Sequence, residues 1–553
     1  MRLVLSLTFS TLALFASVAH AAPAQNALTV YGEPPKYPAN FTHFDYANPD
    51  APKGGSLKRS AIEIGQFDHV LPYIDKGIGV SQVDGWIYSP LAVRSLDEPY
   101  TVYGLVAEKM QRADDGLSLR FFLNPKARFA DNTPITAEDV RYTFNLLMTE
   151  GSLSYRMQFE GIKDVVVESP TQVRFDFRNT ENRSLPLDIA TLPVLPEHWW
   201  KTRDFADGGG YEAPLGSGPY RVSKVDSGRS ITFARNPDWW GKDLPVSRGL
   251  YNFDRFSIEY PRLCVQPAKT DVPGSPRAPG PGHALGLRVE QPADDAQHVP
   301  APAELLLQHP AGEPLRGQIP DEVFTQVFEA PKTDASGNLR DKQLQALALL
   351  EQAGWKPKGD QLVNAQGEPL SFTFLNAQNG MERLLLPYKR NLAQIGIRMD
   401  IRRIDPSQYV NRLKNRDYDM IVSGYPVTTS PGIELYNFFG SSTATDPGSN
   451  NFMALQNPAV DSLINGLVKA NTQKQMLSYA HALDRVLQWN YYWIPNYYPP
   501  GISTVWWNRF GIPQIQASND AAIETWWEVS PTPLTNEQMT AELIRRGHDG
   551  GHR

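Results

Sequence analysis

The alternation of apolar and polar residues along the chain predicts several short strands. Val173, Phe175 and Phe177 occupy every second position, which is typical of a strand with one buried face. The runs 119–123 and 165–167 are rich in Leu, Phe and Val and predict two more strands. The region 119–177 is therefore expected to contain several strands.

A helix is predicted to begin directly after Thr136. The Thr136 hydroxyl can cap the first turn, and Asp139, three residues on, is the acidic partner of a capping box. Val140, Phe144 and Leu147 then lie on one face at helical spacing. The pattern indicates an amphipathic helix.

Three more helices are predicted from capping residues and apolar stripes. One covers 344–353 and is closed by Gly354, a second begins at Asp405 followed by Pro406, and a third begins at Asn457. The apolar stripe of the third helix consists of Val460, Leu463, Ile464 and Leu467. Because strands and helices alternate throughout, the expected fold class is α/β or α+β with mixed sheets.

The first residues predict an exported protein. Arg2 precedes an apolar run from Leu3 to Val18, and residues 19–21 have the A-x-A form of a signal-peptide cleavage site. A membrane anchor is the alternative, but the run is shorter than the roughly 20 residues that span a bilayer. No cysteine follows the cleavage site to carry a lipid. A soluble periplasmic protein is therefore expected.

Charge and cysteine content narrow the possible partners and the source of stability. The net charge of -7 is mildly acidic, which disfavours nucleic acid and anionic lipid surfaces as partners. Cys264 is the only cysteine, so no intrachain disulfide can form. Stability must come from buried cores, and a chain of 553 residues is expected to have two or three of them.

The segment from Pro261 to Val323 differs in composition from the rest of the chain. It contains no Phe, Tyr or Trp, although these residues make up 11% of the sequence. Twelve prolines lie between Pro261 and Pro320, where the single cysteine is also found. Such a composition is typical of a disordered, proline-rich linker.

The sequence contains none of the common catalytic patterns. H-E-x-x-H, G-x-S-x-G, a Walker loop and C-x-x-C are all absent, and Gly216-Ser217-Gly218 does not form a nucleophile elbow. His43, His198 and His481 lack metal-ligand spacing. We therefore expect no catalytic residue, no metal site and no cofactor. A secreted hydrolase of peptides or glycans is the alternative, and it would need a catalytic pair or triad.

Three motifs together carry a resemblance to a known family. They are LNPKARFADNTP at 123–134, PLGSGPYRV at 214–222 and ARNPDWWG at 234–241. In order and spacing, the chain resembles the bacterial extracellular solute-binding proteins of family 5, the dipeptide-, oligopeptide- and nickel-binding group. FTHFDY at 41–46 and SLDEP at 95–99 are similar to its longer oligopeptide-binding subgroup, which includes microcin C uptake proteins.

The resemblance implies a two-lobe periplasmic binding protein fold with an extra subdomain in the first lobe. The lobes close over a ligand by a hinge motion. The resemblance further implies a monomer that captures extended oligopeptides and delivers them to the transmembrane subunits of an ABC permease. The expected boundaries are a signal peptide at 1–21, a first lobe at 22–60, 185–262 and 500–530, an extra subdomain at 61–184, an anomalous segment at 263–310, a second lobe at 311–499 and a polar tail at 531–553.

The resemblance also implies where the ligand binds. In this family a peptide lies extended and pairs through its backbone, and a carboxylate holds its amino terminus. The matching stretch, 423–434, lacks the Asp of shorter dipeptide binders, so Glu434 is the expected amine ligand rather than a surface carboxylate. Tyr425 is expected to form a wall of the cleft, with core packing as its alternative. The expected ligand-binding residues are Tyr425, Glu434, Asn450, Asn451 and Phe452.

The resemblance offers a second interpretation of the anomalous segment. At this place the family has a strand and helix of the form F-V-F-N-x-R-x-P-x-F-Q-D-R-R-V-R, which the chain lacks. Permitted codons for residues 263–278, read one nucleotide later, encode FVFNPRKPMFQDRRVR. We therefore expect that about 263–309 is translated out of frame. On this interpretation the chain is a damaged copy of a binding protein.

Overall fold

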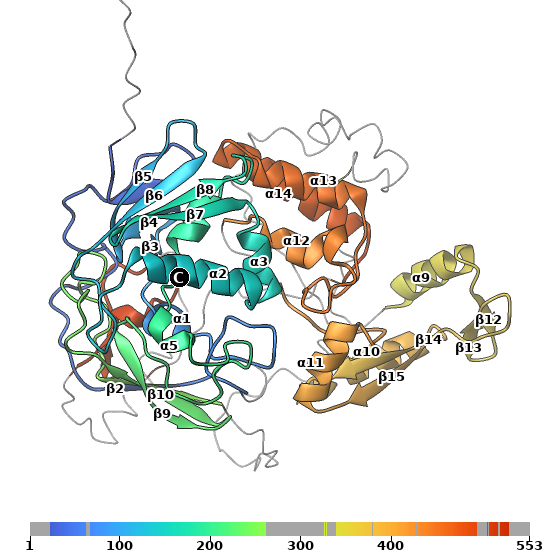
Figure 1. Ribbon diagram of the computed structural model, residues 1–553. Coiled ribbons are helices and arrows are strands. Elements are labelled where there is room, and N and C mark those ends of the chain that lie inside the picture. Colours follow the sequence, from blue (N-terminus) through green and yellow to red (C-terminus); the bar gives the residue numbers. More distant parts are fainter. Residues whose placement is uncertain are drawn as a thin grey trace, which may run out of the picture.

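The structure is a computed structural model that combines helices with mixed sheets (Figure 1). It describes residues 23–61, 67–260, 339–378, 380–425, 430–494, 508–517 and 520–529, together with 326, 328 and 506. The expected signal peptide, the anomalous segment 263–310 and the polar tail lie outside the described residues.

A four-stranded antiparallel sheet with the order β5-β6-β8-β7 occupies the expected extra subdomain. Its strands are β5 (Ala107–Arg112), β6 (Ser118–Leu123), β7 (Ile162–Ser169) and β8 (Gln172–Phe177). Helix α2 (Ala137–Thr149) packs against β7 and β8, and the capping box of Thr136 and Asp139 begins it as expected. Val140 and Leu147 of α2 are fully buried. Residues at this spacing share one face of a helix, and in α2 that face is turned toward the core.

A second four-stranded sheet has the order β2-β11-β10-β9, with β2 parallel to β11 and the other pairs antiparallel. Its strands are β2 (Ser56–Ser60), β9 (Tyr220–Asp226), β10 (Ser230–Arg235) and β11 (Arg255–Glu259). A three-stranded sheet joins β1 (Ala27–Thr29), β4 (Glu98–Gly104) and β3 (Ala92–Ser95). Short helices α1 (Val83–Trp86), α3 (Leu153–Gln158), α4 (Leu185–Ala190) and α5 (Glu197–Trp200) complete this part. The expected mixed α and β fold is confirmed.

Two of the recognised sequence motifs meet at Ser217. The Ser217 carbonyl accepts hydrogen bonds from the indole nitrogens of Trp239 (2.8 Å) and Trp240 (3.2 Å). A Cβ on Gly218 would lie 2.2 Å from the Trp86 carbonyl oxygen, so only glycine permits this approach. The two motifs are therefore bonded to each other through the Ser217 carbonyl.

The C-terminal half divides into a small α/β unit and a helical unit (Figure 1). The small unit contains α9 (Arg340–Gln352), β12 (Lys356–Lys358), β13 (Gln361–Val363), β14 (Ser371–Asn376), α10 (Glu382–Ala393), β15 (Arg398–Arg403) and α11 (Pro406–Asn415). The helical unit contains α12 (Glu434–Phe439), η1 (Ser441–Thr443), α13 (Pro458–Val468) and α14 (Gln473–Trp489). The chain then continues through β16 (Phe510–Gly511), η2 (Ile523–Thr525) and β17 (Trp527–Glu528).

The apolar cores follow the same division. The largest cluster runs from Leu28 to Tyr260 and includes Trp526 from the C-terminal return. The helical unit has its own core beneath α12, α13 and α14, whereas the buried cluster of the small unit consists of Phe374, Leu385 and Met399 with partly buried neighbours. Among the described residues, the core of the small unit is therefore smaller than that of the helical unit.

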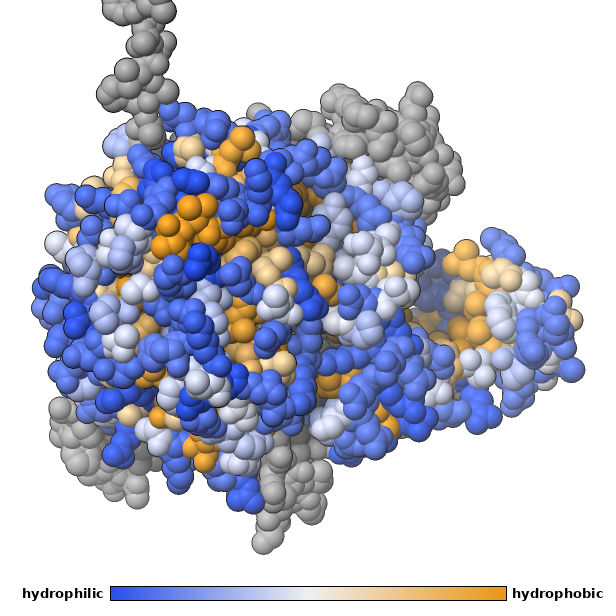
Figure 2. Space-filling view, in the orientation of Figure 1, coloured by the Kyte–Doolittle hydropathy of each residue, from blue (hydrophilic) through white to orange (hydrophobic). Residues whose placement is uncertain are grey.

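Helix α9 shows the consequence of this small core. It begins four residues earlier than the pattern predicted, and none of its residues is buried. Leu344 and Leu349 are 55% and 65% exposed. Figure 2 shows hydrophobic side chains gathered on this unit, at the right of the view. Leu347 and Leu350 are partly buried, so the described residues cover one side of α9 only in part.

Candidate functional site

Glu434 is the first residue of α12 and lies at the contact between the helical unit and the first lobe. Its Oε1 atom accepts a hydrogen bond from the Gly432 amide at 2.9 Å. A Cβ on Gly432 would lie 3.2 Å from Ser184 Oγ, which precedes α4, so the two segments approach closely. Burial raises the pKa of Glu434; nearby Asp188 also raises it, while two backbone amides and Arg94 oppose the shift.

Asp188 and Arg94 complete a polar cluster with Glu434. Asp188 Oδ1 lies 3.8 Å from an Arg94 Nη2 atom, and Asp188 Oδ2 accepts a hydrogen bond from Ser184 Oγ at 3.0 Å. Burial raises the pKa of Asp188, and Arg94 acts against this shift. Arg94 also donates to Ser430 Oγ at 3.3 Å, which links the first lobe to the turn before α12. When both carboxylates are ionised, one guanidinium faces two negative charges.

An aromatic cluster lies at the other end of α12. The Tyr425 ring centroid is 5.5 Å from that of Phe438 and 5.0 Å from that of Phe439. Trp493 and Phe452 are 5.9 Å and 6.4 Å from the same ring. Burial, with a smaller contribution from Tyr418, raises the pKa of Tyr425 to about 12. Phe438 and Phe439 belong to the buried core of the helical unit, and Tyr425 and Trp493 are partly buried against it.

The loop 449–452 carries the remaining expected site residues. Asn451 is fully buried. Its Nδ2 donates to the carbonyl oxygens of Gly440 and Leu455, and its Oδ1 accepts from the Leu455 amide. Its side chain therefore supports the loop. The Asn450 backbone amide donates to Asn437 Oδ1 at 3.1 Å, and the Phe452 ring faces the aromatic cluster.

The structure thus brings Tyr425 and Phe452 together and places Glu434 at the opposite end of α12. Sequence reasoning missed Arg94 and Asp188, because no spacing pattern relates these positions to residues more than two hundred positions away. It also missed Trp493, although the aromatic run of residues 491–493 is a visible signal.

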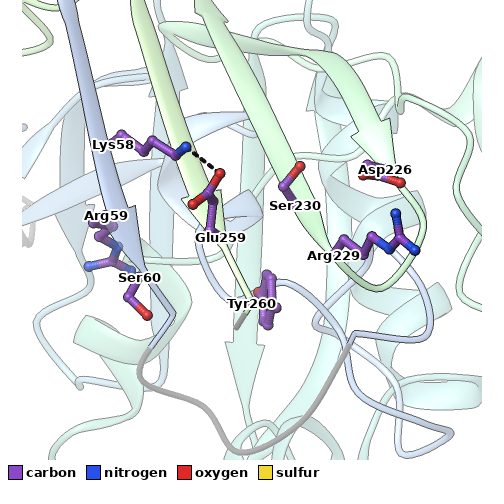
Figure 3. A pocket seen from close by; sticks show the side chains of 8 residues that line it. All are labelled: Lys58, Arg59, Ser60, Asp226, Arg229, Ser230, Glu259 and Tyr260. Atoms are coloured by element: carbon purple, nitrogen blue, oxygen red, sulfur yellow. Dashed lines mark ion pairs between the residues drawn. The ribbon is translucent and has the colours of Figure 1, made fainter. Parts of the chain in front are cut away.

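A separate cavity lies beside the ends of β2, β10 and β11 and has a volume of about 480 Å³. Figure 3 shows Lys58 paired with Glu259 at its wall, with Arg229 at the opposite side. None of the expected ligand-binding residues lines this cavity.

In the part of the chain that the structure describes, no group of three or more His, Cys, Asp or Glu residues is placed to hold a metal ion. The same part of the chain includes no helix with the length and hydropathy needed to span a bilayer.

The fold and the site define a two-lobe solute-binding protein. The chain belongs to the bacterial extracellular solute-binding proteins of family 5, whose model matches residues 101–261 and 312–447. The match is interrupted from 262 to 311, which closely coincides with the segment of unusual composition. The resemblance inferred from the sequence motifs is confirmed.

Known relatives support this assignment over most of the chain. The uncharacterized protein YejA of Escherichia coli K12 is 33% identical over 598 residues, covering 94% of this chain and 96% of its own length. The peptidoglycan-binding protein YepA of Agrobacterium fabrum is 29% identical, covering 91% of this chain and 95% of its own length. An alignment of 598 residues exceeds the 553 of this chain, so YejA contains internal residues that this chain lacks.

A solved structure shows the same fold. The oligopeptide-binding protein AppA of Bacillus subtilis, in complex with a nonapeptide, superposes with a TM-score of 0.60 at 17% identity. The superposition covers 87% of this chain and all of AppA. The expected two-lobe periplasmic binding protein fold is confirmed.

Proposed function

We propose that the protein captures extended oligopeptides in the periplasm, as a monomer, and presents them to an ABC permease. The observation that carries this proposal is the cluster of Glu434, Asp188 and Arg94, in which two half-buried carboxylates lie near one guanidinium. A peptide ammonium group would balance the excess negative charge there. In this proposal Glu434 holds the amino terminus.

The spacing along α12 suits an extended peptide. Glu434 and Phe438 are four residues apart, which corresponds to about 6 Å along a helix. An extended peptide advances about 3.3 Å per residue, so its second and third residues would reach the aromatic cluster. Tyr425, Phe452 and the Asn450 side chain would then contact the peptide, while Asn451 would hold the loop.

The lobes enclose this site in the proposed mechanism. The first lobe, 22–262 with the return at 500–530, supplies Arg94 and Asp188, and the second, 311–499, supplies Glu434 and the rings. A ligand that contacts both lobes stabilises their closed arrangement, because these contacts exist only there. The permease would recognise the closed form.

The anomalous segment bears on whether this particular chain is active. We propose that about 263–309 is an out-of-frame translation, and that an in-frame strand and helix would complete the second lobe. The interrupted family match and the additional residues of YejA support this proposal. Resequencing the gene tests it, since a nucleotide sequence that does not encode the family strand and helix when read one position later would refute it.

Calorimetry after native mass spectrometry tests the proposed function. Mass spectra of protein purified without denaturation should show a retained peptide mass. Titration should give heat with free-amine oligopeptides, and these peptides should remain uncleaved after prolonged incubation. Heat with oligosaccharides alone would contradict the proposal, and peptide turnover would favour a secreted hydrolase. Heat with murein peptides alone would restrict the proposed ligand to peptidoglycan fragments, the class in the name of the peptidoglycan-binding protein YepA.

A further inference from the structure

Arg416 occupies a backbone conformation that is unusual for its residue type. It follows α11 with φ 54° and ψ 35°, the left-handed conformation that ends many helices. Glycine is usual at this position, because a side chain there costs roughly 1 kcal/mol or more. An arginine in this conformation therefore needs side-chain interactions that offset the cost.

The Arg416 guanidinium is surrounded by neutral acceptors from another part of the chain. Its Nη2 lies 3.2 Å from the Thr443 carbonyl oxygen, 2.9 Å from that of Asp446 and 2.6 Å from Ser449 Oγ. Its Nε donates to the Asn451 carbonyl oxygen at 3.1 Å. Within the described part of the chain, Arg416 forms no ion pair with a carboxylate. The guanidinium instead binds several acceptors of one loop, residues 443–452, which is the site loop.

That loop is the one that carries the candidate ligand contacts. Its end is also held by Tyr418, whose hydroxyl donates to the Phe452 carbonyl oxygen at 2.5 Å. Two residues before Arg416, Lys414 Nζ donates to the Asp75 carbonyl oxygen of the first lobe at 2.6 Å. The end of α11 therefore connects the small α/β unit to the site loop and to the first lobe.

We propose that Arg416 is a positioning residue that fixes the loop 443–452 in its ligand-binding conformation. This inference rests on the proposed function for its effect on affinity, although the effect on the loop is independent of any ligand. Arg416 itself contacts no ligand in this proposal. It holds the backbone that places Asn450 and Phe452.

The variant Arg416→Gly separates the side chain from the backbone, because glycine suits the left-handed conformation. We expect amide hydrogen exchange within 443–452 to accelerate at least tenfold, while amides at the end of α11 keep their protection. Affinity for oligopeptides should fall by about 10- to 100-fold, as found when outer partners of binding groups are removed. Low millimolar guanidinium chloride should restore both properties by filling the vacated position, whereas urea should not.

Arg412→Gln is the matched control. It removes a positive charge one turn earlier, from a side chain that bonds to Asp417, outside the loop. Unchanged exchange in 443–452 of Arg416→Gly, or loss that guanidinium does not restore, would overturn the proposal. If wild-type protein binds no peptide, the proposed function fails, and hydrogen exchange still decides the role of Arg416.

Discussion

Replacement of Glu434 by glutamine tests the proposed amine site most directly. In the wild type the Gly432 amide donates a hydrogen bond to Glu434 Oε1 at 2.9 Å. Glutamine has the same shape, and its carbonyl oxygen can accept the same hydrogen bond. The substitution removes one of two carboxylates that lie near Arg94. The free protein should therefore tolerate the change, because the remaining charges of Asp188 and Arg94 balance.

The magnitude follows from the separation and the surroundings of the charges. Two unit charges about 3 Å apart interact by roughly 5.5 kcal/mol at an effective dielectric constant of about 20, and by about 1.4 kcal/mol in bulk water. Glu434 is buried enough for its pKa to rise, but Arg94 reduces the net attraction for a cation. We expect a loss of about 2–5 kcal/mol in binding free energy, as for a desolvated charge pair that loses one partner. This loss is about 30- to 5,000-fold in Kd.

The assay is isothermal titration calorimetry with a free-amine peptide and its N-acetylated form, on wild type and Glu434→Gln. Wild type should prefer the free amine, and the variant should lose most of this preference. Glu351→Gln is the control, since it removes the same charge from an exposed position on α9. Equal wild-type affinity for the free and acetylated peptides would refute the reasoning and remove Glu434 from the site.

Four further outcomes are expected. Gly218→Ala should destabilise the first lobe by about 1–3 kcal/mol in urea unfolding, because its Cβ would overlap the Trp86 carbonyl. Trp493→Ala should weaken apolar peptides in calorimetry by about 1–3 kcal/mol while leaving the preference for a free amine. Burial raises the pKa of Glu524 from 4.5 to about 7, so the folded state retains a proton that the unfolded chain loses. Its contribution to stability is therefore present below pH 4.5 and lost as pH rises through 7, and Glu524→Gln should flatten that decline in urea titrations between pH 5 and 8. Limited proteolysis should cut first within 261–320, and a protease-resistant chain that binds peptide tightly would contradict the out-of-frame interpretation.

Local sequence signals predicted the elements of the fold well. Thr136, Asp405 and Asn457 each cap the helix that the pattern assigned to them. Capping depends on residues within one turn, so a single sequence contains the necessary information. The strands around 119–123 and 173–177 were likewise evident, since an alternating burial pattern is a local property.

The site was only partly accessible to the same reasoning. Glu434 could be named from its motif, but Asp188 becomes its neighbour only through the packing of α12 against the first lobe. Tertiary contacts of this kind leave no periodic trace in the sequence. Asn451 shows the converse error, in which the sequence indicates a ligand contact where the side chain has a structural role. Its amide group donates to the carbonyl oxygens of Gly440 and Leu455.

The exposed face of α9 bears on the interpretation of the anomalous segment. Leu344 and Leu349 are more than half exposed, and burial of one leucine side chain stabilises a fold by about 1.5–3 kcal/mol. A segment that lacks aromatic residues and is rich in proline is poorly suited to cover them, since proline cannot extend a sheet ladder. The small unit also contacts the loop 443–452 through Arg416. If the proposed out-of-frame translation is correct, an in-frame strand and helix should cover Leu344 and Leu349, and the repaired chain should then be more stable than the present one in urea unfolding.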